Sequence, residues 1–305
     1  MSPELRFDGR VVIITGAGGG LGRAHALLFA RRGAHIVVND LGAGRDGTGR
    51  SSDAARAVVD EIRALGGSAI DNGDSIEDGE QIVAAGQQAF GRVEVVINNA
   101  GIRRDASFGK MTDADWDRVY RVHVQGAFKV TRAAWEPMRQ QGFGRVIFTA
   151  SAAGLYGNFG QANYAMAKAA LTGLGRTLVV QGARKNVHVN VIAPVAGSRM
   201  TATVLPPEVT AALLPEHGSP LVAWLCHESC AENGGMFEVG GGFFAKVRHE
   251  RSAGLVADAA APASPELVRD RFAAVVDFGP DATHPDDIGA AAGPLLANLV
   301  AGAER

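Results

Sequence analysis

The stretch that decides the fold reads Val11-Val12-Ile13-Ile14-Thr15-Gly16-Ala17-Gly18-Gly19-Gly20-Leu21-Gly22. Its four β-branched apolar residues are typical of a strand that is buried on both faces of a parallel sheet. The glycine cluster then opens a helix that Arg31-Arg32-Gly33 ends. We expect Gly16 to permit a tight turn, Gly20 to let the backbone approach a phosphate, and Gly22 to let the helix pack closely. The start of the helix would stabilise the anion.

Apolar runs like the first one recur along the chain, at residues 36–38, 93–97, 146–148, 187–192 and 236–239. Helical patterns lie between them. One has an apolar stripe of Ala54, Val58, Ile62 and Leu65, with Ser52 or Asp53 as its cap and Gly66-Gly67 as its end. Strands that alternate with helices predict an α/β fold with a Rossmann-like, doubly wound parallel sheet.

The pattern changes after Gly240-Gly241-Gly242. Residues 246–305 open with basic residues and continue rich in alanine, with prolines at 262, 265, 280 and 285. About 60 residues do not readily build a core alone. We therefore expect one Rossmann domain over 1–245, and a mostly helical C-terminal extension over 246–305 that packs on the same domain.

The composition narrows the class of protein. The 305 residues are 47% apolar and 20% charged with a net charge of −2, which is ordinary for a globular protein and gives no sign of nucleic-acid binding. The chain has two cysteines, Cys226 and Cys230, so no disulfide framework and no metal site is expected. The polar N-terminus, the absence of an apolar run of about 20 residues and the ending Ala-Glu-Arg predict no signal peptide, membrane span or peroxisomal signal. We expect a cytoplasmic protein.

Asp40 ends the second apolar run and indicates which dinucleotide binds. A carboxylate there can accept hydrogen bonds from the adenosine ribose and repels a 2′-phosphate, so NAD is favoured over NADP. A solvated turn aspartate is the alternative reading, and Arg45 and Arg50 are close enough in sequence to bind a phosphate. Ligands of open α/β sheets sit at the carboxyl ends of strands. Further cofactor contacts are therefore expected at Gly19, Leu21, Asp74, Ser75, Asn99, Ala100 and Gly101.

Tyr164 and Lys168 stand four residues apart in Tyr-Ala-Met-Ala-Lys and would share one face of a helix. Ser151 follows the apolar run 146–148. A hydroxyl, a phenol and an ammonium gathered in this way can move a proton to or from a carbinol oxygen. A nearby ammonium lowers the pKa of a tyrosine from its usual value of about 10, which makes the phenol a better base.

The spacing of these residues, with the glycine cluster and Asn98-Asn99-Ala100-Gly101, resembles the short-chain dehydrogenase/reductase family over about residues 8–245. The resemblance implies that Tyr164 is the general acid/base, that Lys168 lowers its pKa and holds the nicotinamide ribose, and that Ser151 orients the substrate oxygen. Pro194, Ala196 and Gly197 are implied cofactor contacts. Helices near 112–139 and 161–182 would pair across a two-fold axis and give a homodimer or homotetramer.

His123 stands where many members of the family carry an asparagine that supports a relay water. Its imidazole could hold that water, serve as a relay, or be a packing histidine. Stretches around Asp40, His123 and Tyr164 resemble a narrower branch, the (3R)-hydroxyacyl-CoA dehydrogenase domains of type 2 multifunctional enzymes. Val195 departs from that branch, in which an asparagine is expected.

The narrower resemblance implies NAD-dependent oxidation of a (3R)-3-hydroxyacyl-CoA, a β-oxidation step. Oxidation of a 17β-hydroxysteroid or of a sterol side-chain thioester is the enzymatic alternative, and a dinucleotide-binding regulatory protein is the alternative without turnover. Residues 200–215 are expected to form a lid over the acyl chain. Lys246, Arg248 and Arg251 are candidates for binding the phosphates of coenzyme A, although a solvated basic edge is the favoured explanation.

Overall fold

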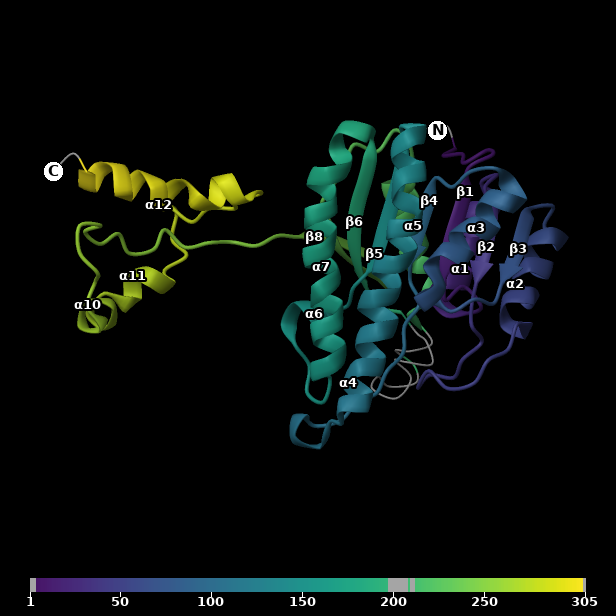
Figure 1. Cartoon of the computed structure of the whole chain (residues 1–305), viewed down its shortest axis with the longest axis horizontal. Helices are drawn as coiled ribbons and strands as arrows, with labels where there is room; N and C mark the ends of the chain where they lie inside the picture. Colours follow the sequence, from purple (N-terminus) through teal and green to yellow (C-terminus); the bar gives the residue numbers. More distant parts are fainter. Residues whose placement is uncertain (1–3, 197–207, 209–211, 304–305) are drawn as a thin grey trace. The chain divides into compact units, whose positions relative to one another are not determined.

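The computed structural model describes residues 4–196, 208 and 212–303 of the chain (Figure 1). The chain divides into two compact units, Met1–Lys246 and Val247–Arg305. In the described part of the chain, no helix is long and apolar enough to cross a membrane. The expectation that the C-terminal extension packs on the first unit stays a prediction.

The first unit is built on a sheet that, within the described residues, has eight strands in the order β3-β2-β1-β4-β5-β6-β7-β8. The strands from β1 to β7 pair in parallel. Their bounds are β1 Val11–Thr15, β2 His35–Asn39, β3 Ser68–Asn72, β4 Val95–Asn98, β5 Gly144–Thr149, β6 Val187–Pro194, β7 Met236–Gly240 and β8 Phe243–Val247. The doubly wound sheet expected from the apolar runs is confirmed. The order reverses between β1 and β4, and this reversal opens a crevice at the carboxyl ends of the strands.

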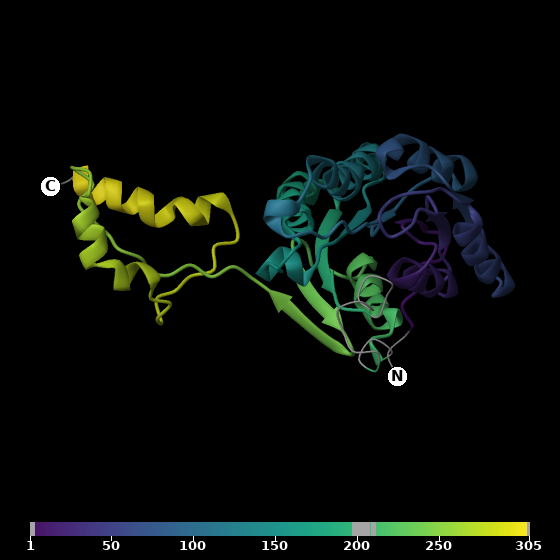
Figure 2. The same ribbon diagram turned by 90° about the horizontal axis from the view of Figure 1, so that it is seen from below.

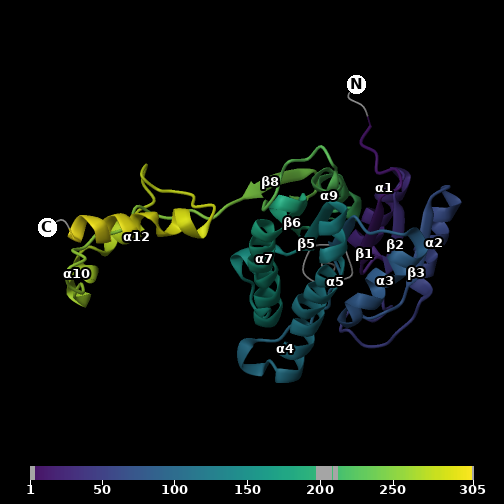
Figure 3. The same cartoon turned by 45° about the horizontal axis from the view of Figure 1, so that its top comes forward.

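Helices cover both faces of the sheet (Figures 1 and 2). One face carries α3 (Gly79–Phe90), α5 (Gly126–Gln141) and α7 (Ala162–Gly182), and the other carries α1 (Gly20–Arg31), α2 (Asp53–Ala64) and α9 (Ser219–Cys226) (Figure 3). The strand runs are apolar throughout because both of their faces are covered. Ile13, Ile97 and Phe148 are fully buried between the two helical layers.

The helix α2 follows the expected stripe with two corrections. Val58 and Ile62 are buried, but Leu65 is 54% exposed because it lies past the end of the helix. Ser52 occupies the cap position without a capping hydrogen bond from its side chain. Ser51 Oγ instead accepts a hydrogen bond from Asp53 N over 3.1 Å.

The second unit contains α10 (Pro265–Asp270), α11 (Phe272–Val276) and α12 (Ile288–Ala303). Arg251 and Thr283 form an antiparallel bridge within it. Arg251 Nη1 also donates to the carbonyl of Ala291 over 2.8 Å. The helices of this unit are its main regular elements, as its alanine-rich sequence predicts.

Candidate active site

The turn between β1 and α1 forms one wall of a cavity of about 420 Å³, which we call the glycine-loop cavity. Gly16 has a φ of +65°, and a Cβ there would lie 2.7 Å from Ala100 Cα. At Gly22 a Cβ would lie 2.3 Å from the carbonyl oxygen of Gly16. Only glycine fits either position, so the turn and the helix start hold the shape expected for an anion cradle. The lining includes Gly16, Gly19, Gly20, Leu21, Asp40, Ser75, Asn99, Ala100 and Gly101.

Asp40 lies on the rim of this cavity, held by backbone donors. Gly18 N donates to Asp40 Oδ2 over 2.8 Å, and Gly42 N donates to Oδ1 over 2.7 Å. The carboxylate is therefore fixed next to the glycine turn. Arg45 also lines the cavity, whereas Arg50 Nη2 donates to the carbonyl of Gly73 over 2.8 Å.

The ends of β1 and β4 are tied together by Thr15 and Asn99. Thr15 Oγ1 accepts hydrogen bonds from Asn99 N over 3.0 Å and from Ala100 N over 3.1 Å. Asn99 Nδ2 donates to the carbonyls of Thr15 and Gly16. This role of Thr15 was not predicted from the sequence. Its position at the end of the first strand, where ligand sites form, could have indicated it.

Asp74 and Ser75 were both expected to contact the cofactor, but only Ser75 lines the glycine-loop cavity. Ser75 lines the glycine-loop cavity, and its Oγ accepts from Glu77 N over 3.2 Å. Asp74 is absent from the lining of that cavity. Its carboxylate accepts from Asn72 Nδ2 over 2.8 Å, and its carbonyl accepts from Asn39 Nδ2 over 2.9 Å.

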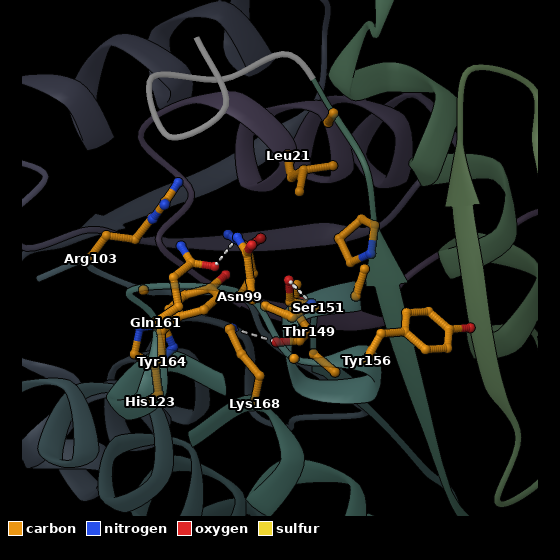
Figure 4. A pocket seen from close by; sticks show the side chains of 18 residues that line it. Leu21, Asn99, Arg103, His123, Thr149, Ser151, Tyr156, Gln161, Tyr164 and Lys168 are labelled. Carbon is orange, nitrogen blue, oxygen red and sulfur yellow. Dashed lines mark hydrogen bonds between the residues drawn. The ribbon is translucent and has the colours of Figure 1, made fainter. Parts of the chain in front are cut away.

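A second cavity of about 470 Å³, the tyrosine cavity, adjoins the first and shares Leu21, Asn99 and Gly101 with it. Ser151, Tyr164 and Lys168 all line it, and Figure 4 shows their side chains around one space. Further lining residues that sequence reasoning missed are Arg103, Thr149, Tyr156, Asn158 and Gln161. The expected contacts Pro194 and Ala196 line it as well.

Three elements bring the proposed catalytic side chains together. Ser151 caps the short helix α6 (Ala152–Tyr156), and its Oγ accepts from Ala153 N over 3.2 Å. Tyr164 and Lys168 lie on α7, with Lys168 Nζ 5.6 Å from the centre of the Tyr164 ring. Lys168 Nζ donates to the carbonyl of Thr149, at the end of β5, over 2.5 Å.

The pKa shifts differ from the expectation that Lys168 lowers the pKa of Tyr164. Burial raises the pKa of Tyr164, and its hydrogen bond with Ser151 only partly offsets this. Burial also lowers the pKa of Lys168 to about 7, so much of this amine is uncharged near neutral pH. The physical reason is the same for both residues, because a dry site disfavours either charged form.

His123 lies in a single π-helical turn, η3 (Arg121–Gln125), between α4 (Asp113–Tyr120) and α5. Its Nε2 lies 3.0 Å from Ile102 N and 2.9 Å from Ile102 O, and its ring meets that of Tyr164 edge-on at 5.3 Å. Burial lowers the pKa of His123 to about 3, so the ring is neutral. Among the described residues, its buried Nδ1 has no hydrogen-bond partner. His123, Asn98 and Lys168 also line a small cavity. Both a packing role and a neutral hydrogen-bonding role fit this geometry.

The remaining residues singled out in the sequence lie outside the two cavities or outside the described residues. Gly197 and most of the expected lid, residues 200–207 and 209–211, fall outside the described residues. Val195 lines neither cavity, and its N donates to the carbonyl of Val239 over 2.8 Å. Lys246 Nζ pairs with Glu232 over 2.9 Å, and its role in phosphate binding stays a prediction. Cys226 and Cys230 are free and buried, and the described residues contain no group of three potential metal ligands.

The comparisons with known proteins agree with this geometry. The family model described as short chain dehydrogenase matches residues 10–207. The chain is 54% identical over 297 residues to peroxisomal multifunctional enzyme type 2 of Mus musculus, covering 97% of this chain and 40% of that protein. It is 40% identical over 257 residues to the hydroxyacyl-CoA dehydrogenase ChsB1 of Mycobacterium tuberculosis, covering 77% of this chain and 78% of that protein.

Solved structures of related dehydrogenases also match this chain. Full-length peroxisomal multifunctional enzyme type 2 from Drosophila melanogaster matches with a TM-score of 0.82 and 41% identity, over 97% of this chain and 50% of that one. A 7α-hydroxysteroid dehydrogenase complexed with NADH and 7-oxo glycochenodeoxycholic acid matches with a TM-score of 0.69 and 31% identity, over 78% of this chain and 95% of that one. This chain thus spans 40% of the mouse multifunctional enzyme and 50% of the fly one.

Proposed function

The chain belongs to the short-chain dehydrogenase family and acts on a CH–OH group, and from this premise we propose that it oxidises a (3R)-3-hydroxyacyl-CoA to the 3-ketoacyl-CoA with NAD. The observation that carries the proposal is the meeting of Ser151, Tyr164 and Lys168 in a cavity that adjoins the glycine-loop cavity. The likeness to a named hydroxyacyl-CoA dehydrogenase supports the substrate class.

The glycine-loop cavity fits a dinucleotide. A Cβ built at Gly19 or Gly20 meets nothing within 4 Å, so the backbone there is open to a ligand. Gly16, Gly19, Gly20, Leu21, Asn99, Ala100 and Gly101 would hold the nucleotide, and Asp40 would receive its adenosine ribose hydroxyls. A bound nicotinamide would supply the acceptor for the hydride from carbon 3 of the substrate.

The side chains of the tyrosine cavity would orient the substrate hydroxyl and accept its proton. Ser151 would hold the substrate hydroxyl beside Tyr164, and the Tyr164 oxygen would take its proton as the carbonyl forms. Lys168 lies behind the ring and, when charged, favours the phenolate. His123 braces the Tyr164 ring edge and the Ile102 backbone as a neutral group. The proton and the hydride together account for the two hydrogens that the alcohol loses.

NADH formation tests this proposal directly. Purified protein is assayed with (3R)- and (3S)-3-hydroxyacyl-CoA and with a 17β-hydroxysteroid, the substrate of the alternative reading. Tyr164→Phe should abolish NADH formation while NAD binding persists, and Tyr120→Phe, on the exposed face of α4, is the matched control. Turnover confined to the (3S) thioester, or unchanged in Tyr164→Phe, would contradict the proposal.

The assembly and compartment are also proposals. Pairing through α4, α5 and α7 would give a homodimer or homotetramer. The names of the multifunctional relatives place those proteins in peroxisomes, whereas the composition of this chain predicts a cytoplasmic protein.

A further inference from the structure

Arg103 and Asp105 form an ion pair beside Tyr164, and the proposed reaction uses neither side chain. The guanidinium carbon of Arg103 lies 6.0 Å from the centre of the Tyr164 ring, and Arg103 lines the tyrosine cavity (Figure 4). The Arg103 side chain is only 10% exposed. Water therefore screens its charge weakly, and the charge acts on the phenol across a short distance.

The pair is fixed by donors from two parts of the chain. Arg103 Nη2 and Nε both donate to the Asp105 carboxylate, the latter over 3.3 Å. Gln161 Nε2 donates to Asp105 Oδ2 over 3.1 Å, and Gln161 Oε1 accepts from Asn158 Nδ2 over 2.9 Å. Because Gln161 directly precedes α7, this network ties the charge pair to the helix that carries Tyr164.

We propose that Arg103 and Asp105 are positioning residues whose opposed charges set the electrostatic field at the Tyr164 hydroxyl, and thereby the pH range in which it exchanges a proton. The proposal rests on the proposed role of Tyr164 as the group that takes the substrate proton. It adds two residues, outside the family triad, that adjust this group without touching the reacting atoms.

The groups that face Tyr164 support opposite effects of Arg103 and Asp105 on its pKa. Burial raises the pKa of Tyr164, Ser151 and Arg103 lower it, and Asp105 raises it. From α7, Lys168 is uncharged at the alkaline pH of a tyrosine titration, which lies well above its pKa of about 7. From η3, His123 is neutral as well. In the described residues, Arg103 and Asp105 therefore supply the permanent charges at this phenol.

Opposite changes to the two residues separate an electrostatic role from a structural one. Arg103→Gln leaves the anion and should favour the phenol, whereas Asp105→Asn leaves the cation and should favour the phenolate. The double variant restores neutrality and should return close to the parent. Loss of packing alone would move both single variants in the same direction or leave the titration of Tyr164 unchanged.

Ultraviolet difference titration of tyrosinate reads the phenol without any substrate. The chain has three tyrosines, so Tyr120→Phe/Tyr156→Phe leaves Tyr164 as the only phenol. In that background at fixed alkaline pH, the tyrosinate-to-phenol ratio should fall roughly three- to tenfold in Arg103→Gln and rise by a similar factor in Asp105→Asn. The matched controls are Arg56→Gln and Asp71→Asn, from an ion pair between α2 and β3. Circular dichroism checks that each variant is folded.

The pH profile of kcat in the otherwise native chain is the second measurement, and its alkaline shift in Arg103→Gln should match the titration. Shifts of opposite sign that cancel in the double variant support the proposal. Shifts of the same sign, or none beyond those of the controls, would overturn it. Opposite shifts in the titration without turnover of hydroxyacyl-CoA would leave this inference intact and refute the proposed substrate instead.

Discussion

Burial makes Lys168 the most pH-sensitive cation of the site. The residue is 3% exposed, and the carbonyl of Thr149 accepts a hydrogen bond from its amine over 2.5 Å. A pKa of about 7 means that the amine gains and loses its charge within the physiological range. When Lys168 is charged, its amine, 5.6 Å from the centre of the Tyr164 ring, favours the phenolate.

The lowered pKa of Lys168 gives a stability prediction. The unfolded chain holds this proton up to pH near 10.5, whereas the folded chain releases it near pH 7. The unfolded state therefore binds more protons between these values, and folding stability rises with pH through that window. Below pH 7 both states are protonated, so the full cost of burying the charge is present there.

Replacement of this amine removes that cost. Lys168→Met should raise the free energy of unfolding by roughly 1–4 kcal/mol at pH 6.5, after the lost hydrogen bond to Thr149 is subtracted. The gain should shrink as the pH rises toward 9, and urea unfolding of the ligand-free proteins measures it. Lys185→Met, on the surface after α7, is the control. A constant difference between pH 6.5 and 9 would contradict the assigned pKa.

The positions of single site residues could be predicted from sequence motifs. Properties that depend on burial, such as a pKa, could not. Ser151, Tyr164 and Lys168 were predicted from spacing, and all three line one cavity. The net rise of the Tyr164 pKa was not predicted, because the sequence shows that an ammonium is near but does not show how dry the site is. Arg103 was missed since it becomes informative only when the loop after β4 folds against α7.

At the level of elements, the turn after β1 and the end of β2 act together. Asp40 receives its hydrogen bonds from Gly18 N and Gly42 N, so the glycine turn orients the residue that would choose the nucleotide. Asp40→Asn keeps the shape and removes the charge, and its single acceptor oxygen retains one of the two backbone hydrogen bonds. It should raise the ratio of kcat/KM with NADP to that with NAD by roughly tenfold, because the repulsion of a 2′-phosphate is lost.

Asp60→Asn, on the exposed face of α2, is the control for that change in cofactor ratio. Asp40→Ala should additionally lower the melting temperature, since two backbone donors lose their acceptor. An unchanged ratio in Asp40→Asn would assign nucleotide choice to another group, with Arg45 on the cavity lining as the first candidate.

Elements were predictable in proportion to their apolar content. The buried strands β1, β4 and β5 were predicted from continuous apolar runs. The strand β8 was not, because its residues are largely exposed and its pairing depends on the hairpin at Gly241-Gly242. The π-helical turn η3 has no signature in the sequence, and its backbone places His123 against Ile102.

At the level of the whole molecule, the alternation of strands and helices fixes the first unit. The same logic fails for residues 247–305, because short alanine-rich helices bury little of their own surface. Phe272, Ile288 and Leu295 of this unit are exposed. The sequence therefore predicted its helical content but could not predict its packing partner.

The assembly prediction follows from the outer surface of α5 and α7. Phe128 on α5 is 43% exposed and Val180 on α7 is 74% exposed, although both are large and apolar. Burying them between two copies of the chain would remove this apolar surface from water. Light scattering should therefore give a mass of two or four chains. Phe128→Glu/Val180→Glu should shift it toward one chain, whereas Leu65→Glu, just past the end of α2, should not. A wild-type protein that stays monomeric at micromolar concentration would refute pairing through these helices.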